Sequence, residues 1–162
     1  MKNFTHEFTV SSSLEDTFDM VFNDTDTLDA VHGRGRYSVT PWSGDARNIS
    51  FEMEPCGIPD VVLKVIGNGK MAASVKQTAR RETDKITVTN RVRPRVLGAE
   101  FVRIRPTFTL SAVPGGTSVR VSCDVCAILP CPLDGIAEDF MKKTSEVSFG
   151  WLQKSLQKLC EP

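Results

Sequence analysis

Two cysteines three residues apart, Cys123 and Cys126, have the spacing of a zinc-binding or redox-active pair. They fall in a stretch where apolar and polar residues alternate, which is typical of a β-strand. Residues i and i+3 of a strand point to opposite faces, so the two sulfur atoms should diverge. We therefore predict no metal site here. The odd total of five cysteines favours free thiols and a reducing, cytoplasmic location.

The chain has two histidines, His6 and His32, and no Gly-x-Ser-x-Gly nucleophile motif. Alternation places His6 on the apolar side of a strand, where we expect a hydrogen-bonded core residue rather than a general base. His32 precedes Gly33 at a predicted helix end, where a capping role suffices. The segment 67–70 lacks the rest of a phosphate-binding loop and is predicted to be a hairpin turn. We expect no catalytic residue and no cofactor.

A cluster of arginines is the most unusual feature of the sequence. By alternation, the arginines of two successive strands face outward, and the loop between them carries one more arginine and an apolar tip. Such a surface is suited to peripheral contact with an anionic membrane, because basic groups attract headgroups and apolar side chains can leave water. A nucleic-acid surface would also need exposed aromatic residues, so no nucleic-acid partner is expected. The alternative is a solvated sheet face. The residues are Arg91, Arg93, Arg95, Val96, Leu97, Arg103 and Arg105.

Apolar periodicity predicts the elements that carry these residues. A strand at 4–10 is followed by two short helices within 14–31, and then by antiparallel strands separated by turns such as Ser43-Gly44-Asp45. The runs 61–66 and 71–78 are predicted to pair around Gly67-Asn68-Gly69. We predict seven strands in all, each with one apolar face.

From about Pro132, apolar or small residues recur every 3.6 positions for over seven turns, with Glu138 and Asp139 on the opposite, polar face. A long helix after antiparallel strands must bury its apolar stripe on the concave face of the sheet. We therefore predict one α+β domain over residues 1–162, with a cavity of at least roughly 300 Å³ between sheet and helix. The expected cavity residues are Phe51, Met53, Val75, Gln77, Val88, Asn90, Phe108, Val121, Phe140, Val147 and Trp151.

This order of elements resembles that of the helix-grip (SRPBCC) superfamily, which contains the START lipid-transfer domains and the birch-pollen-allergen proteins. Within it the chain is similar to VASt domains, the sterol-binding modules of membrane contact sites. The resemblance implies a domain that binds a sterol or another lipid in its cavity and moves it between membranes. We expect the protein to be a monomer. The matching segments are Thr40-Pro41-Trp42, Gly44-Asp45-Ala46-Arg47 with Ile49-Ser50-Phe51, Lys76-Gln77-Thr78, and Trp151-Leu152.

Two alternatives remain open at this stage. An enzyme of the polyketide-cyclase type would need ionisable groups inside the cavity, whereas the inward polar residues are only His6, Gln77 and Asn90 by alternation, which favours binding over catalysis. The other alternative is an interaction domain with a filled core, since a fold alone does not establish ligand binding.

Overall fold

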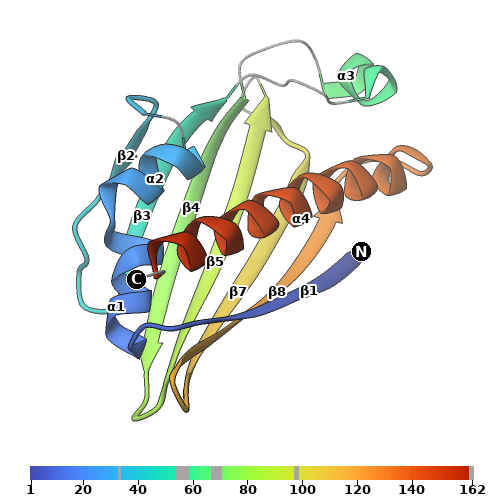
Figure 1. Ribbon diagram of the computed structural model, residues 1–162. Coiled ribbons are helices and arrows are strands. Elements are labelled where there is room, and N and C mark those ends of the chain that lie inside the picture. The colour runs from blue at the N-terminus through green and yellow to red at the C-terminus, as the bar shows by residue number, and fades with distance from the viewer. Residues whose placement is uncertain (33, 54–58, 67–70, 97–98, 161–162) are drawn as a thin grey trace.

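The computed structural model describes residues 1–32, 34–53, 59–66, 71–96 and 99–160, and its centre is a curved antiparallel sheet (Figure 1). Seven strands lie in the order β1-β8-β7-β5-β4-β3-β2, and the short β6 pairs with β5. The predicted seven-stranded sheet is confirmed. In chain order the strands are β1 (Lys2–Val10), β2 (Tyr37–Val39), β3 (Ala46–Met53), β4 (Met71–Arg81), β5 (Lys85–Val96), β6 (Ala99–Glu100), β7 (Val102–Val113) and β8 (Gly116–Ala127).

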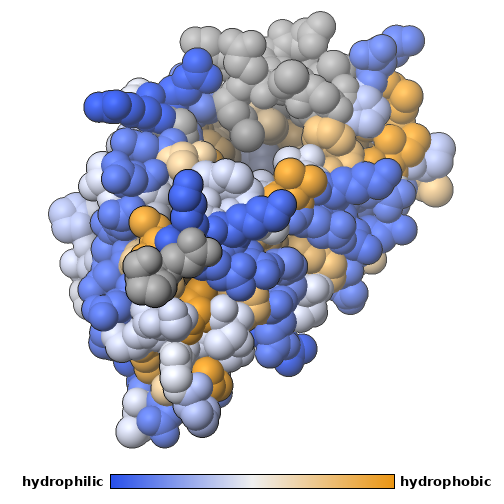
Figure 2. Space-filling view, in the orientation of Figure 1, coloured by the Kyte–Doolittle hydropathy of each residue, from blue (hydrophilic) through white to orange (hydrophobic). Residues whose placement is uncertain are grey.

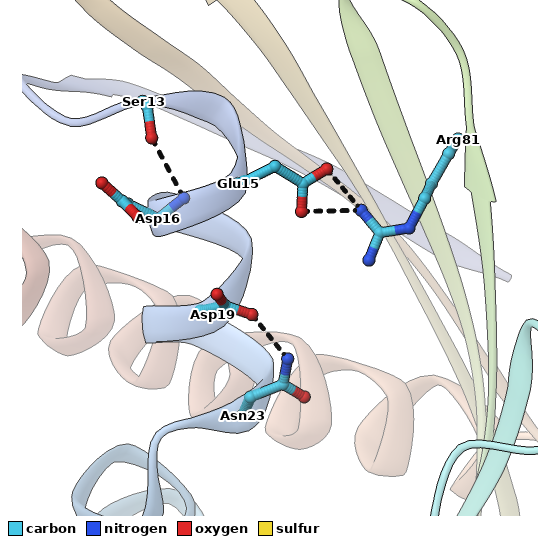
Figure 3. A network of polar contacts seen from close by, with 6 residues as sticks. All are labelled: Ser13, Glu15, Asp16, Asp19, Asn23 and Arg81. Atoms are coloured by element: carbon cyan, nitrogen blue, oxygen red, sulfur yellow. Dashed lines mark hydrogen bonds and ion pairs between the residues drawn. The ribbon is translucent and has the colours of Figure 1, made fainter.

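Two short α-helices follow β1, as predicted, and a π-helical turn joins them. The Ser13 hydroxyl caps the first helix by accepting a hydrogen bond from the Asp16 N–H at 3.2 Å. Arg81 of β4 donates to both carboxylate oxygens of Glu15 at 2.7 and 2.9 Å (Figure 3), and its guanidinium lies 4.4 Å from the centre of the Phe18 ring. This contact ties the first helix to the sheet. The helical segments are α1 (Leu14–Phe18), η1 (Asp19–Asn23) and α2 (Thr25–His32).

The closing helix α4 (Leu133–Leu159) crosses the sheet on the same side as α1 and α2 (Figure 1), as predicted. Its buried apolar side chains are Ala137, Met141, Leu152 and Leu156. They form a narrower stripe than the sequence indicated. Hydrophobic side chains also reach the surface along this helix among hydrophilic neighbours (Figure 2).

Three side chains of α4 differ from the orientation predicted from the sequence. Val147 and Trp151 are 73% and 44% exposed, so their expected inward orientation was wrong. Each residue turns about 100° around a helix, which takes Trp151 away from the direction of its neighbour Leu152. Glu138, expected in solvent, is buried, and its carboxylate accepts a hydrogen bond from the Ala127 N–H at 3.3 Å.

Residues 61–66, predicted as a strand, lie in a helix, α3 (Asp60–Ile66), so that prediction was wrong. A short apolar run has no periodicity that separates a strand from a buried helix. Pro59 and Asp60 are residues typical of a helix start, and the Pro59 carbonyl accepts a hydrogen bond from the Val62 N–H at 2.9 Å. Val62 is fully buried and α3 contacts α4, so tertiary packing favours the helix.

Two clusters of buried side chains lie between the sheet and the helices. The first includes Phe18 of α1, Leu110 of β7 and Leu156 near the end of α4. The second includes Val125 of β8 and Met141 in the first half of α4. Phe149 of α4 packs against both clusters, so the helix joins them.

We expect Leu156→Ala to lower the free energy of unfolding by about 2 to 5 kcal/mol, because this side chain is fully buried and the change leaves a cavity. Leu159→Ala is the matched control on the same helix. Its side chain is 61% exposed, so the loss should stay within about 0.5 kcal/mol. Urea unfolding of both variants measures the difference, and equal losses would show that the last turns of α4 do not pack as described.

Candidate functional site

A pocket of about 170 Å³ lies beside Phe149, between the concave face of the sheet and the helices. It is smaller than the cavity of at least roughly 300 Å³ that we expected. Val31 of α2, which lines it, is 52% exposed, so the pocket reaches the surface at that helix. Its walls come from η1, α2, four strands and α4. The lining residues are Val21, Phe22, Leu28, Val31, His32, Phe51, Val75, Gln77, Asn90, Val92, Pro106, Phe108, Ser148, Phe149 and Leu152.

The structure brings five of the predicted cavity residues together at this pocket. They are Phe51, Val75, Gln77, Asn90 and Phe108. The others lie elsewhere: Val88 and Val121 are fully buried in the first cluster, Phe140 packs against the second, and Val147 and Trp151 are exposed. The side chain of Met53 falls outside the described part of the structure.

A row of polar side chains crosses the sheet at the level of the pocket. Strand register pairs Arg47 of β3 with Gln77 of β4, and Gln77 with Asn90 of β5. Asn90 in turn donates from its side-chain nitrogen to the carbonyl of Pro106 on β7 at 3.1 Å. All three polar side chains are more than nine-tenths buried. Buried polar groups are costly unless they are paired. These three polar side chains therefore interrupt an otherwise apolar face of the sheet at an energetic cost that their hydrogen bonds must offset.

Arg47, the first residue of this row, does not line the pocket and instead holds Gln77 in place. Its Nε–H donates to Gln77 Oε1 at 2.6 Å, and its Nη2 donates to the Phe22 carbonyl of η1 at 2.5 Å. The guanidinium also lies 4.5 Å from the centre of the Trp42 ring. Burial lowers the pKa of Arg47 from its ordinary value. Arg47 is not among the cavity residues predicted from the sequence, although continuing the alternation of Ile49 and Phe51 by two residues places it inward.

His32, expected to cap a helix, instead lines the pocket, which corrects that prediction. Its ring lies 4.9 Å from that of Phe51 and 5.7 Å from that of Tyr37. Burial, and secondly the positive charge of Arg47, lowers the pKa of His32 to about 4, so the ring is neutral at pH 7. Its Nδ1 is buried and has no hydrogen-bond partner among the described residues. Nothing in the local sequence distinguishes this role from a cap.

His6 behaves as predicted. It is partly buried, and its Nε2 lies 2.6 Å from Gln153 Oε1 on α4.

Cys123 is buried and Cys126 is exposed, which confirms that the two thiols diverge. Burial, chiefly, raises the pKa of Cys123 to about 12, as expected of an unreactive core thiol.

Within the described ranges, no group of three or more His, Cys, Asp or Glu residues is arranged to hold a metal ion. None of the described helices combines the length and the apolar character that a membrane-crossing helix needs.

The arginines of the sequence cluster lie on the convex face of the sheet, away from the pocket. Arg91, Arg93, Arg95, Arg103 and Arg105 are all exposed, which confirms their outward orientation. Arg93 and Arg103 lie 3.8 and 3.4 Å from the carboxylate of Glu100 and are partly neutralised by it. The side chain of Val96 and the whole of Leu97 are outside the described residues. None of these arginines lines the pocket.

We expect the stability of the protein to fall between pH 7 and pH 4 partly because of His32. Its folded-state pKa of about 4 lies below the ordinary value near 6.5, so in this window the unfolded chain binds a proton that the folded chain does not. The ring is partly exposed, so we expect a contribution of about 1 to 2 kcal/mol. Urea unfolding at both pH values should show that His32→Gln loses less stability than the unmodified protein. Equal losses would mean that the ring is hydrated in the folded state.

No protein-family profile and no curated protein sequence matches this chain. Solved structures do match its fold. A STAR-related lipid transfer protein fragment from Xanthomonas axonopodis aligns with a TM-score of 0.68 at 13% identity, covering 96% of this chain and 85% of that one. The ZhuI aromatase/cyclase from Streptomyces sp. R1128 aligns with a TM-score of 0.67 at 9% identity, covering 98% and 93%.

A START superfamily protein from Mycobacterium smegmatis aligns with a TM-score of 0.56 at 14% identity, covering 97% of this chain and 98% of that one. These proteins include a lipid transfer protein and an aromatase/cyclase, so the fold is compatible with both binding and catalysis. At such identities the likeness concerns the fold alone. The chain has the helix-grip fold of START-like and Bet v 1-like proteins.

Proposed function

We propose that this protein binds an apolar small molecule in the pocket between the sheet and α4. The observation that carries the proposal is the pocket itself, whose walls are mostly apolar and include four phenylalanines, with a few polar groups converging on it. Small-molecule sites typically have this composition. Clusters of buried apolar side chains lie on both sides of the pocket.

The volume of the pocket favours a ligand of one or two rings. A cavity of roughly 150 Å³ holds a benzene molecule, which is close to the 170 Å³ available here. A sterol, the ligand of the VASt domains that the sequence resembles, is larger than the pocket. Its entry would require α2 or α4 to move away from the sheet.

The alternative of a polyketide-cyclase-like enzyme has one observation in its favour, which is the neutral His32 in the pocket with a free Nδ1. A general base works best when its pKa lies near the working pH, and a pKa of about 4 makes His32 a weak base. The pocket walls that the structure describes contain no carboxylate, thiol or lysine to assist it. The chemistry of the pocket therefore favours binding over catalysis.

Contact with an anionic membrane is the second part of the proposal, and the convex face supports it. A groove of about 420 Å³ on this face is lined by Ser50, Ser74, Lys76, Arg91 and Arg93, among others. Arg91 and Arg105 have no ion-pair partner among the described residues, so their charge is available to headgroups. Since this face is opposite the pocket, membrane binding and ligand exchange would use different surfaces.

We expect Val75→Phe to fill the pocket and abolish binding of 2-methylnaphthalene, an apolar two-ring probe, while changing the free energy of unfolding by less than about 1 kcal/mol. Val75 is inward and lines the pocket. Val119→Phe is the control, because Val119 is fully buried in the first cluster away from the pocket, and overpacking there should cost about 1 to 3 kcal/mol.

Fluorescence titration and urea unfolding measure these two effects, and native mass spectrometry of the purified protein tests for a co-purified molecule. If Val75→Phe destabilises the fold as much as Val119→Phe does, the space is not a usable cavity.

We expect vesicles with anionic headgroups to bind the protein and neutral vesicles not to, with binding weakened by salt because the Debye length is only ~10 Å at 0.1 M. Arg91→Glu combined with Arg105→Glu should remove this binding. Arg80→Glu combined with Arg120→Glu changes the net charge equally, at exposed positions outside the cluster, and should retain most of it. Co-sedimentation is the measurement. Unchanged binding in the first variant would identify the arginines as a solvated sheet face.

A further inference from the structure

We propose that the pocket selects a ring compound that carries a hydroxyl group, and that this hydroxyl is held between the side-chain amides of Gln77 and Asn90. The inference rests on the proposed function, because it names the class of ligand that the same pocket takes. It follows from the orientation of the two amides, which their other hydrogen bonds fix.

The orientation of the Gln77 amide is set by Arg47. A guanidinium N–H can only donate, so the Gln77 atom that it contacts at 2.6 Å must be the carbonyl oxygen Oε1. The remaining polar atom of Gln77 is therefore its NH₂ group, which has no partner among the described residues, and the side chain lines the pocket. Because Oε1 accepts from a cation, the N–H groups become stronger donors. Gln77 thus presents a donor to the ligand.

The orientation of the Asn90 amide is set in the same way by Pro106. A backbone carbonyl can only accept, so the Asn90 atom 3.1 Å from the Pro106 oxygen must be the nitrogen Nδ2. Proline has no N–H to give to β5, and the described β5–β7 register passes from Thr89↔Thr107 to Val92↔Ile104. The Asn90 side chain bridges this interruption. Its free atom is the carbonyl oxygen Oδ1, so Asn90 presents an acceptor to the pocket.

The donor and the acceptor lie side by side, since Gln77 and Asn90 are register partners on β4 and β5. The Cβ atoms of such partners are about 4.5 to 5.5 Å apart, so both side chains reach the same part of the pocket. A hydroxyl group both accepts and donates, so it satisfies both amides at once. A carboxylate or a ketone cannot donate to Asn90, and a hydrocarbon leaves both groups without partners.

The walls around this pair favour an aromatic ring as the body of the ligand. Phe108 lies edge-on to Phe22 and to Phe149, with ring centres 5.2 and 5.8 Å apart. Phe51 lines the pocket from β3. Aromatic side chains arranged in this way offer both edges and faces to a further ring. The combination of aromatic walls and a donor–acceptor pair is complementary to a phenol-type compound.

Three naphthalene probes of similar shape separate the contributions. They are 2-naphthol, which donates and accepts, 2-methoxynaphthalene, which only accepts, and 2-methylnaphthalene, which does neither. We expect the unmodified protein to bind 2-naphthol about tenfold more tightly than 2-methylnaphthalene, the gain expected from two neutral hydrogen bonds of modest net strength, with 2-methoxynaphthalene between them. Fluorescence titration measures the three affinities.

Two substitutions of Gln77 test its role. Gln77→Met removes the donor and should reduce the tenfold preference for 2-naphthol to about threefold, since one of two comparable hydrogen bonds remains. Because this change also leaves the Nε–H of Arg47 without its acceptor, Gln77→Glu is the second variant. It keeps an acceptor for Arg47 and removes the N–H donor, so 2-methoxynaphthalene should lose its advantage over 2-methylnaphthalene. Asn48→Asp, an amide-to-acid change at an exposed position of β3, is the matched control and should leave all ratios unchanged.

The possible results distinguish this inference from the proposed function. Equal affinities for the three probes in the unmodified protein would overturn hydroxyl recognition while leaving the pocket as a binding site. A preference that survives in Gln77→Glu for 2-methoxynaphthalene would overturn the role of Gln77. If none of the probes binds, the proposed function fails for ligands of this size and the inference fails with it.

Discussion

The buried guanidinium of Arg47 is the interaction on which the arrangement of this site depends. It connects three separate parts of the chain, because it donates to Gln77 on β4, donates to the Phe22 carbonyl of η1 and lies against the Trp42 ring. Taking a cation out of water costs several kcal/mol, and here neutral acceptors and an aromatic ring offset that cost, since no carboxylate pairs with it among the described residues. The planar, multiply donating group is required, because the compact ammonium of a lysine cannot reproduce this geometry.

Two properties of the site follow from this interaction. The Phe22 carbonyl lies in η1, where backbone acceptors near a helix end need partners, so the donation from Arg47 holds the short helical layer against the sheet. The donation to Gln77 fixes the direction of its amide. The row then continues through Asn90 to Pro106 and crosses the sheet between the two apolar clusters. The pocket lies beside this row, since Gln77, Asn90 and Pro106 all line it.

The fold could be predicted from the sequence because each of its main signals is local. Alternation in 71–81 and 116–127 and the 3.6-residue period of 133–159 each determine one buried face, and antiparallel strands followed by a long helix can bury these faces in few ways. The failures occur where local pattern is ambiguous. The run 61–66 is compatible with either a strand or a helix, and packing of Val62 decides. The stripe on α4 contains more apolar residues than the sheet covers, so its orientation, and with it the exposure of Val147 and Trp151, depends on tertiary contacts.

The site was less predictable than the fold for a different physical reason. Alternation identified Gln77 and Asn90 as inward, but it contains no information on which groups they contact. Arg47 was accessible to the same reasoning and was missed because an arginine after a turn is ordinarily solvated. His32 has no local signal at all, since its position at the end of α2 is equally suitable for a cap, and only the packing of α2 over Phe51 brings it to the pocket.

Several features that reduce stability gather at this one place. Pro106 lacks the backbone donor that other residues of an interior strand have, Asn90 and Arg47 are buried polar side chains, and the Nδ1 of His32 is buried without a partner among the described residues. A sequence selected for packing alone would have apolar side chains at these positions, like those of the two clusters on either side. Natural proteins violate the rules of packing and hydrogen-bond satisfaction mainly at functional sites. The violations described here all lie at or next to one apolar pocket. Their coincidence is therefore a stronger indication of a binding site than the volume of the pocket.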